Sequence, residues 1–375
     1  GGSSITANTS DEATNIEIVT GSLELRAGAQ IASTNMSENP GGPIMIDATN
    51  HVTITGIASD ESALGIITNI GVVTSGVFSK TTGNGSGSPI TIHTPTLTIE
   101  ETGQVATMTT SDGAGGALTL DLVRLEVNSG GQVTTLSGLD PLTGDLVGTG
   151  AAGDILVTAS ESVSINGQGE FGTPSTLQSI PFGEGVGGAI RVEAPLVRLE
   201  NDGRIETSAF GSGGVGDITL LVDDLFVKNG GLLTTSGSDA ASSGSIFVTA
   251  ANTIELADQP NPTQGGILNL NSGNGGTGTI MIQTENLRLS NGARLMSITF
   301  SSPTPDTGSK VAVHASKSVE LSNHSAIRVI NFSSDVGALD LTTHSLALSG
   351  QSTISAATFA EGNGGPLMIT ADDVT

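Results

Sequence analysis

Hydrophobic and polar residues alternate in short runs along the whole chain, and the runs recur in a fixed order. The clearest unit begins at Ile16, continues with a second run at Leu23 and closes with a third run at Ile31. Alternation within a run places one set of side chains on a buried face, because successive strand residues point to opposite sides. The chain shows no helical periodicity, so three short strands per unit are predicted.

The first hydrophobic residue of each unit marks the period of the repeat. These residues are Ile16, Ile44, Ile90, Leu118, Ile155, Ile190, Ile218, Ile246, Ile280, Val311, Leu339 and Leu367. Six of the eleven intervals are 28 residues and none is shorter, so 28 residues form one turn and the excess is inserted loop. Units that begin at Ile44, Ile155, Ile246 and Val311 place the second run one residue later. Two kinds of coil are therefore expected, and they differ by one residue at the first corner.

Strands that recur one turn later pair in parallel, and such crossovers are right-handed by strong default. One unit cannot bury its hydrophobic face without its neighbours. The predicted fold is all-β: a single right-handed parallel β-helix over residues 1–375, with about twelve coils and three strands per coil. The corners are rich in glycine, which suits sharp turns.

A hydroxyl residue recurs two positions into the third strand of most units. The column contains Ser33, Thr107, Thr135, Thr207, Thr235 and Ser297, with Ala356 in a late unit. Its register predicts that the hydroxyls face inward and form a ladder hydrogen-bonded up and down the stack. Because this regular threonine column is predicted to face inward, the sequence argues against an ice-binding surface.

Composition narrows the function classes. The 37 acidic residues exceed the 12 basic ones and give a net charge of −25, which repels nucleic acid and anionic lipid. Cysteine is absent, so neither disulfides nor thiolate metal sites are expected. No long apolar run is present, and the sequence predicts neither a signal peptide nor a membrane span within these residues.

The combined pattern is Gly-Gly-x-Ile-x-Ile-x-Thr-x-x-Leu-x-Leu-x-x-Gly-Ala-x-Ile-x-Ser, as in residues 14–34, 187–208 and 278–297. It resembles the filamentous-haemagglutinin-like large exoproteins of Gram-negative bacteria and cyanobacteria, over essentially the whole chain. Corners such as Asp47-Ala48-Thr49 and Thr158-Ala159-Ser160 are similar too. The resemblance implies a right-handed β-helix exported by two-partner secretion or a related route, acting as a fibre or adhesin that is extracellular or at the outer cell surface. The family's amino-terminal secretion domain, with its Asn-Pro-Asn-Gly-type motif, is not found.

Nothing in the chain indicates catalysis. Polysaccharide-cleaving β-helices combine clustered carboxylates or a basic residue with aromatic rings, and this chain has no Trp or Tyr. The carboxylate pairs Asp223-Asp224 and Asp372-Asp373 fall at the first corner, where solvated turn residues are expected. The histidines lie in five different surroundings: His51, His93, His314, His324 and His344. We therefore expect no enzyme and assign no catalytic residue.

Metal and cofactor motifs are equally sparse. The calcium-binding Gly-Gly-x-Gly-x-Asp nonapeptide and the EF-hand spacing do not occur. Asp140, Asp145 and Asp154 crowd one insertion, and a weak calcium site there is the one metal hypothesis. Glycine runs at 113–116 and 273–276 lack the Lys-Ser/Thr of a phosphate loop. No metal or cofactor residue is assigned, and no cofactor is expected.

The sequence favours a structural or adhesive fibre segment of a secreted or cell-surface protein. The alternatives are a polysaccharide-active β-helix and a passive spacer that presents another domain. For an adhesin, we expect the ligand contacts in the insertions at 56–88, 136–153, 167–187 and 257–278, since loops carry recognition more often than strands. The expected ligands are host, cell-surface or matrix glycans or proteins.

Contacts between copies are also expected. Neither end of the repeat array shows a capping segment, so the chain is expected to be a window of a longer solenoid or to stack head to tail into filaments. Five outward positions of the first strand are hydrophobic where polar groups would suit a solvated face: Met45, Leu156, Phe247, Met281 and Met368. They raise the hypothesis of lateral packing. Nucleic-acid binding and membrane insertion are not expected.

Overall fold

A computed structural model describes residues 3–11, 13–58, 74–140, 144–170, 172–239, 241–258, 265–300, 309–332, 337–359 and 365–375. These residues form 24 β-strands in two sheets of twelve strands each. Every strand pairing is parallel in both sheets. Among the described residues, no helix is long and apolar enough to cross a membrane.

Sheet A contains the short, odd-numbered strands. They are β1 (Ser4–Thr9), β3 (Gln30–Asn35), β5 (Gly76–Thr81), β7 (Gln104–Thr109), β9 (Gln132–Ser137), β11 (Thr176–Pro181), β13 (Arg204–Ala209), β15 (Leu232–Gly237), β17 (Gly266–Asn271), β19 (Arg294–Thr299), β21 (Ala326–Asn331) and β23 (Thr353–Thr358).

Sheet B contains the long, even-numbered strands. They are β2 (Ile16–Arg26), β4 (Ile44–Thr55), β6 (Ile90–Glu100), β8 (Leu118–Asn128), β10 (Ile155–Asn166), β12 (Ile190–Glu200), β14 (Ile218–Lys228), β16 (Ile246–Ala257), β18 (Thr279–Ser290), β20 (Lys310–Leu321), β22 (Ala338–Leu348) and β24 (Leu367–Val374).

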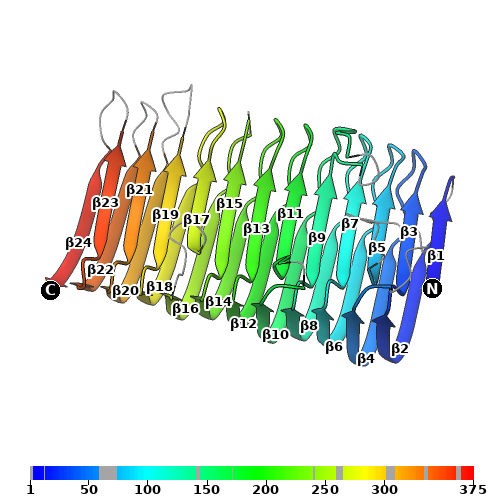
Figure 1. Ribbon diagram of the computed structural model, residues 1–375, viewed down its shortest axis with the longest axis horizontal. Helices are drawn as coiled ribbons and strands as arrows, with labels where there is room; N and C mark the ends of the chain where they lie inside the picture. The colour runs from blue at the N-terminus through cyan, green and yellow to red at the C-terminus, as the bar shows by residue number, and fades with distance from the viewer. Residues whose placement is uncertain are drawn as a thin grey trace.

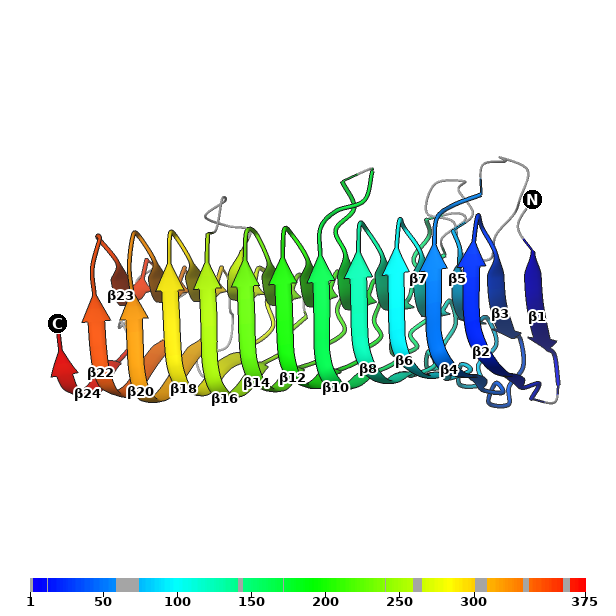
Figure 2. The same cartoon turned by 90° about the horizontal axis from the view of Figure 1, so that it is seen from below.

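The chain winds between the two sheets, so that each coil adds one long strand and one short strand (Figures 1 and 2). Ile218 lies beside Ile246, its equivalent one turn of 28 residues later. The predicted parallel β-helix is confirmed. One detail differs, because the first and second predicted strands of each unit form a single long strand that continues through the first corner. The second corner lies between a long strand and the next short strand, and the third corner follows the short strand.

Hydrophobic side chains from both sheets fill one continuous core along the rod. The residues that mark the period are nearly all fully buried, for example Ile90, Leu118 and Ile190 at 0% exposure. Because full burial of such a side chain contributes about 1.5–3 kcal/mol, the alternating pattern alone supplies a large driving force in every coil. Each coil covers the core of the next one, as expected for a solenoid.

Strand register confirms the two kinds of coil. The pairings on both sides of β4, β10, β16 and β20 shift at the first corner, where each of these strands has its extra residue. Neighbouring coils without the extra residue, such as those of β6 and β8 or β12 and β14, pair without a shift. We call the coils of β4, β10, β16 and β20 bulged coils and the others plain coils.

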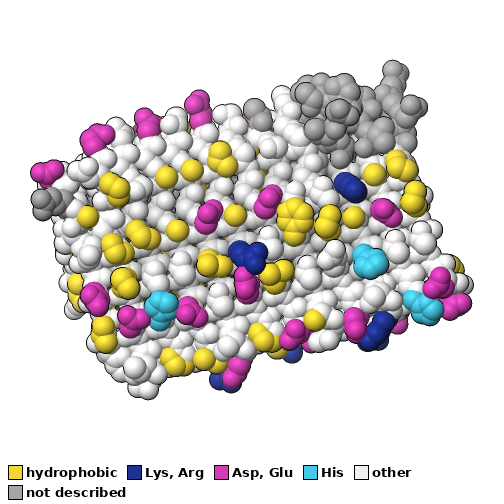
Figure 3. Space-filling view, turned by 180° about the vertical axis from the view of Figure 1, so that it is seen from behind, with side chains coloured by type: hydrophobic (Ala, Val, Ile, Leu, Met, Phe, Trp, Pro, Cys, Tyr) yellow, Lys and Arg dark blue, Asp and Glu magenta, His cyan; other side chains and the backbone are white. Residues whose placement is uncertain are grey.

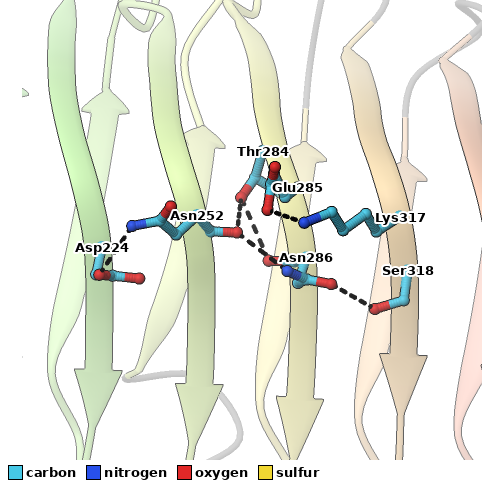
Figure 4. Close-up of polar contacts among 7 residues, drawn as sticks. All are labelled: Asp224, Asn252, Thr284, Glu285, Asn286, Lys317 and Ser318. Atoms are coloured by element: carbon cyan, nitrogen blue, oxygen red, sulfur yellow. Dashed lines mark hydrogen bonds and ion pairs between the residues drawn. The ribbon is translucent and has the colours of Figure 1, made fainter.

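Polar side chains at the first corner connect successive coils (Figure 4). Asn252, in the bulged strand β16, donates from its Nδ2 to Asp224 Oδ2 of the preceding coil at 3.4 Å. Asn286 Nδ2 donates in turn to the Asn252 carbonyl at 3.3 Å, and Ser318 Oγ donates to Asn286 Oδ1 at 3.0 Å. Lys317 forms an ion pair with Glu285. The backbone irregularity is thus accompanied by side-chain contacts between coils.

The hydroxyl column of sheet A faces inward as predicted, but its hydrogen bonds run in another direction. Thr107, Thr207 and Thr235 are fully buried, and each donates to the carbonyl of a corner glycine nine residues later, at 2.7–2.8 Å. Hydroxyls in successive coils start from strands about 4.8 Å apart, which exceeds hydrogen-bonding distance. The predicted ladder up and down the stack is wrong. Thr107, Thr207 and Thr235 instead secure the third corner of their own coil, whereas Ser33 Oγ bonds to Ser88 Oγ at 3.0 Å and the hydroxyls of Thr135 and Ser297 have no hydrogen-bond partner among the described residues.

Glycine at the second corner serves two purposes. In the plain coil of β14, Asn229 and Gly230 have positive φ angles of 50° and 84° and form the turn itself. The next residue, Gly231, is required for space, because a Cβ there would lie 2.0 Å from the Leu199 carbonyl oxygen of the preceding coil. The corners are therefore packed tightly on one another along the rod.

Candidate functional site

Two of the predicted insertions leave the solenoid at the same corner. Residues 56–75 follow β4 and residues 167–175 follow β10, and an antiparallel bridge closes the base of each, Ile57 with Thr74 and Gln168 with Pro174. Residues 59–73 and Phe171 lie outside the described residues. Figure 2 shows the hairpin after β10 rising from the edge at which the long strands end. We call these two insertions the β4 hairpin and the β10 hairpin.

The two hairpins share one construction at their base. Each opens with a glycine of positive φ, 78° at Gly56 and 81° at Gly167, and closes with a buried serine. The amide of Ser75 donates to the Gly56 carbonyl at 3.0 Å, and that of Ser175 donates to the Gly167 carbonyl at 2.9 Å. The base of each hairpin is therefore closed by backbone hydrogen bonding.

The closing serines also tie each hairpin to the coil before it. Ser75 Oγ accepts from the amide of Gly28 at 2.9 Å, and Ser175 Oγ accepts from the amide of Gly130 at 3.0 Å. A buried amide that lost this acceptor would be left unsatisfied, at a cost of about 1–3 kcal/mol. The hairpin bases are thus rigid parts of the rod.

A depression of about 550 Å³ lies between the hairpins. Its floor is formed by the tight corners of the two intervening plain coils, and the bases of the hairpins form its walls. The lining residues are Gly56, Ile57, Glu101, Thr102, Ser129, Gln168, Gly169 and Glu170. Glu101, Thr102 and Ser129 all have positive φ, between 48° and 66°. Ala27, Asn201 and Asn229 have the same conformation at the second corners of other plain coils, so it belongs to the turn of the coil.

The depression is lined mainly by polar groups. It offers the carboxylates of Glu101 and Glu170, the amide of Gln168 and the hydroxyls of Thr102 and Ser129. Glu101 Oε2 already accepts a hydrogen bond from Thr55 Oγ1 at 3.0 Å, which helps to orient the carboxylate. This set suits a ligand with hydroxyl or ammonium donors. Gln168 and Glu170 lie in the insertion at 167–187, one of those where ligand contacts are predicted, whereas sequence reasoning missed Glu101, Thr102 and Ser129.

The aspartates of the predicted calcium site have structural partners. Asp140 and Asp145 lie in a third hairpin, whose base pairs Leu139 with Leu146, and the Asp140 amide donates to the Asp145 carbonyl at 2.9 Å. Asp154 accepts from the amide of Ala189 in the next coil at 2.7 Å. Among the described residues, no group of three or more His, Asp or Glu side chains is placed to hold a metal ion.

Three of the five histidines face carboxylates of neighbouring coils. His51 lies 3.8 Å from Glu24, and His93 lies 3.3 Å from Asp121. His344 Nδ1 lies 2.7 Å from Asp372 Oδ2, and this hydrogen bond and charge raise the pKa of His344. Of the predicted carboxylate pairs, Asp372 makes this contact and Asp224 accepts from Asn252. These residues thus contact neighbouring coils at separate points along the rod.

The hydrophobic column proposed for lateral packing is partly exposed. Met45 and Met281 are each 37% exposed and Met368 is 58% exposed. Phe247 and Met281 are neighbours in the register, but Thr91, Thr119 and Thr219 occupy other places in the column. Figure 3 shows hydrophobic side chains dispersed among acidic ones on the face opposite that of Figure 1.

Compared with models of protein families, with curated proteins and with solved structures, the chain matches none. No family membership follows from these comparisons. What the repeat pattern implies about export and adhesion is therefore a matter for proposal.

Proposed function

We propose that this chain is a structural or adhesive fibre segment of a secreted or cell-surface protein, with its ligand contacts at the hairpin corner. The single observation that supports the proposal is the polar depression between the β4 and β10 hairpins, held on a rigid rod. Twelve coils at about 4.8 Å each give a rod about 55–60 Å long. The resemblance of the repeats to large exoproteins agrees with an extracellular location.

In this proposal the strands are the support and the hairpins are the recognition surface. The strands are fixed on both sides by parallel pairing, so they serve as a scaffold, whereas the hairpins project from it. Recognition on loops that a rigid scaffold positions is a common arrangement. The buried serines at the hairpin bases favour it further, because they hold the walls of the depression in place.

Head-to-tail stacking of copies into filaments is part of the proposal. Each coil covers the core of the next by parallel pairing, and a coil of a second copy can pair in the same way.

The adhesive part is tested by removing the hairpins. Residues 57–74 and 168–174 are each replaced by a two-residue turn, and binding to cells or matrix is measured with the rod displayed on beads. We expect binding to fall at least tenfold while the β-sheet circular dichroism stays unchanged. An Asn50→Ala variant, altered at the first corner, is the control. Unchanged adhesion after both deletions would refute the proposed contact site, and a rod that never adheres would favour a passive spacer.

The polysaccharide-active alternative is supported by one observation, the presence of Glu101 and Glu170 in the same depression. Carboxylate pairs are the usual catalytic groups of glycoside hydrolysis. The test is the release of reducing ends from a panel of acidic polysaccharides. Release that disappears in Glu101→Gln would favour the enzyme over the fibre.

A further inference from the structure

Asparagine directly precedes glycine at several corners of the rod. This pair of residues is chemically labile, because the glycine amide nitrogen can attack the side-chain carbonyl carbon of the asparagine with no side chain of its own in the way. The pairs are Asn84-Gly85, Asn166-Gly167, Asn229-Gly230, Asn274-Gly275, Asn291-Gly292 and Asn363-Gly364. The last pair lies outside the described residues. The surroundings of the other pairs can therefore be compared.

The reaction of such a pair is a deamidation that needs only water. A bond forms between the glycine nitrogen and the asparagine Cγ, the Cγ–Nδ2 bond breaks, and the glycine amide proton leaves with Nδ2 as ammonia. Water then hydrolyses the resulting succinimide ring at either carbonyl, which leaves aspartate or isoaspartate. The glycine N–H must therefore be able to lose its proton, and its nitrogen must be able to reach Cγ.

Hydrogen bonds between coils protect the pairs at Asn84, Asn166 and Asn291. Each glycine amide donates to a carbonyl of a neighbouring coil, so attack on Cγ would first break this bond and leave the carbonyl unsatisfied. The bonds are Gly85 to Ser37 at 2.9 Å, Gly167 to Glu200 at 3.2 Å and Gly292 to Asn323 at 2.8 Å. The asparagine side chains are hydrogen-bonded as well, to Glu38, Asn201 and Asp258 respectively.

Backbone conformation protects Asn229. Its φ angle of 50° lies in the left-handed region, where ψ is about +47°. At that ψ the amide nitrogen of the next residue lies on the opposite side of the Cα–C bond from Cβ, so Gly230 N points away from the asparagine side chain. Ring closure would require rotation of a peptide group at the second corner, beside the tightly packed Gly231. Asn291, with a φ angle of 54°, has this protection in addition to its hydrogen bonds.

Asn274 has neither kind of protection. It lies at the third corner after β17, in the glycine run at 273–276, and it is exposed. Its φ angle is not positive. Within the part of the chain that the structure describes, the Gly275 amide has no hydrogen-bond acceptor and the Asn274 side chain has no hydrogen-bond partner. Both conditions for ring closure can therefore be met at this pair.

We propose that Asn274 is a modification site of the folded rod, where deamidation by water yields aspartate or isoaspartate. The product adds one negative charge to an acidic chain, and isoaspartate also lengthens the main chain before Gly275. That corner has no room for the change, because the Gly275 carbonyl accepts from the buried Asn271 side chain and a Cβ at Gly275 would lie 2.3 Å from the Ala241 carbonyl oxygen. The third corner of this coil therefore loosens as the protein ages. The inference does not depend on the proposed function.

Incubation of the folded rod in mildly alkaline buffer, followed by peptide mapping with mass spectrometry, tests the assignment. We expect Asn274 to deamidate at least tenfold faster than Asn84, Asn166, Asn229 and Asn291. In rods unfolded in urea the five sites should react at similar rates, because the Asn-Gly sequence is common to all of them. A similar rate at any of the other four sites in the folded rod would overturn the proposal, and so would reaction of Asn274 only after unfolding.

Two variants of Asn274 separate the chemistry from its structural effect. Asn274→Gln keeps the amide but would have to close a six-membered ring, a much slower reaction, so the mass change in this peptide should fall at least tenfold. Asn274→Asp carries the charge of the product without the longer main chain. We expect aged rods that contain isoaspartate to unfold at lower urea concentrations than Asn274→Asp rods. Equal midpoints would contradict the loosening of the corner, and an undiminished mass change in Asn274→Gln would overturn the site itself.

Discussion

Plain and bulged coils share one core but differ in the length of chain at their second corners. A plain coil has a long strand without the extra residue and a short second corner, as between β14 and β15. Three of the four bulged coils, those of β4, β10 and β16, carry insertions at the second corner, and β20 is the exception. Insertions at the second corner therefore occur in bulged coils, whereas the hairpin of Asp140 and Asp145 lies at the third corner of a plain coil.

The residue before the short strand differs between most plain coils and the coils of the two hairpins. In plain coils this place is held by residues such as Gly131, Gly203 and Gly231, whose backbone lies against a carbonyl of the preceding coil. In the β4 and β10 coils Ser75 and Ser175 occupy it, and Ser175 uses its hydroxyl to accept from one amide and donate to the Asn166 carbonyl. A side-chain anchor thus replaces close backbone packing at these two hairpins, whereas the β16 coil has Gly265 in this place.

The largest expected effect is the loss of close packing at a plain coil. A Cβ at Gly203 would lie 2.0 Å from the Ile165 carbonyl oxygen, and backbone atoms on both sides cannot move aside cheaply. We expect Gly203→Ala to lower the free energy of unfolding by about 3 kcal/mol, measured by urea denaturation. Gly21→Ala, where the nearest atom would be 3.5 Å away, is the control and should change little. Equal stability of the two variants would contradict this account of the corner.

The serine anchor is the next test. Ser175→Ala removes the acceptor of the buried Gly130 amide, and we expect a loss of about 1–3 kcal/mol in the free energy of unfolding. Ser352 occupies the same place in the plain coil of β22, but its buried hydroxyl has no hydrogen-bond partner. Ser352→Ala should therefore be close to neutral. A similar loss in both variants would mean that the hydroxyl does not act as an anchor.

Transfer of a hairpin tests whether bulged coils tolerate insertions as a class. The β20 coil has Ser325 in the anchoring place, and Ser325 Oγ donates to the Ser322 carbonyl at 2.7 Å. Grafting residues 167–174 in place of Asn323 and His324 should cost about 1 kcal/mol, mostly loop-closure entropy. The same graft in place of Asn229 and Gly230, in a plain coil, should cost clearly more. Thermal denaturation compares the two, and equal costs would show that coil type does not matter.

The sequence predicted the fold because every coil repeats the same burial requirement. Residues such as Ile155 and Val157 face the core in each turn, so their spacing reveals the strands, and the shifted second run reveals the bulge. The sequence could not predict the direction of the hydroxyl hydrogen bonds. Only the folded turn brings the carbonyl of the corner glycine, nine residues later, close to the hydroxyl. The depression was missed for a similar reason: it joins corners of four successive coils that are far apart in the chain.

The smallest expected effect is the pH dependence of stability that arises from a contact at a corner of a plain coil. His344 in β22 contacts Asp372 in β24, and the hydrogen bond and charge of that carboxylate raise the pKa of His344 above its usual value. A raised pKa in the folded state means that this contribution to stability is complete below the unfolded pKa, about 6.5, and is lost as pH rises through the folded pKa. Both side chains are exposed, so the change in stability should be slight. An NMR titration of the imidazole is the sharper measurement: Asp372→Asn should move the pKa of His344 down toward 6.5, and an unchanged pKa would show that the contact does not form in solution.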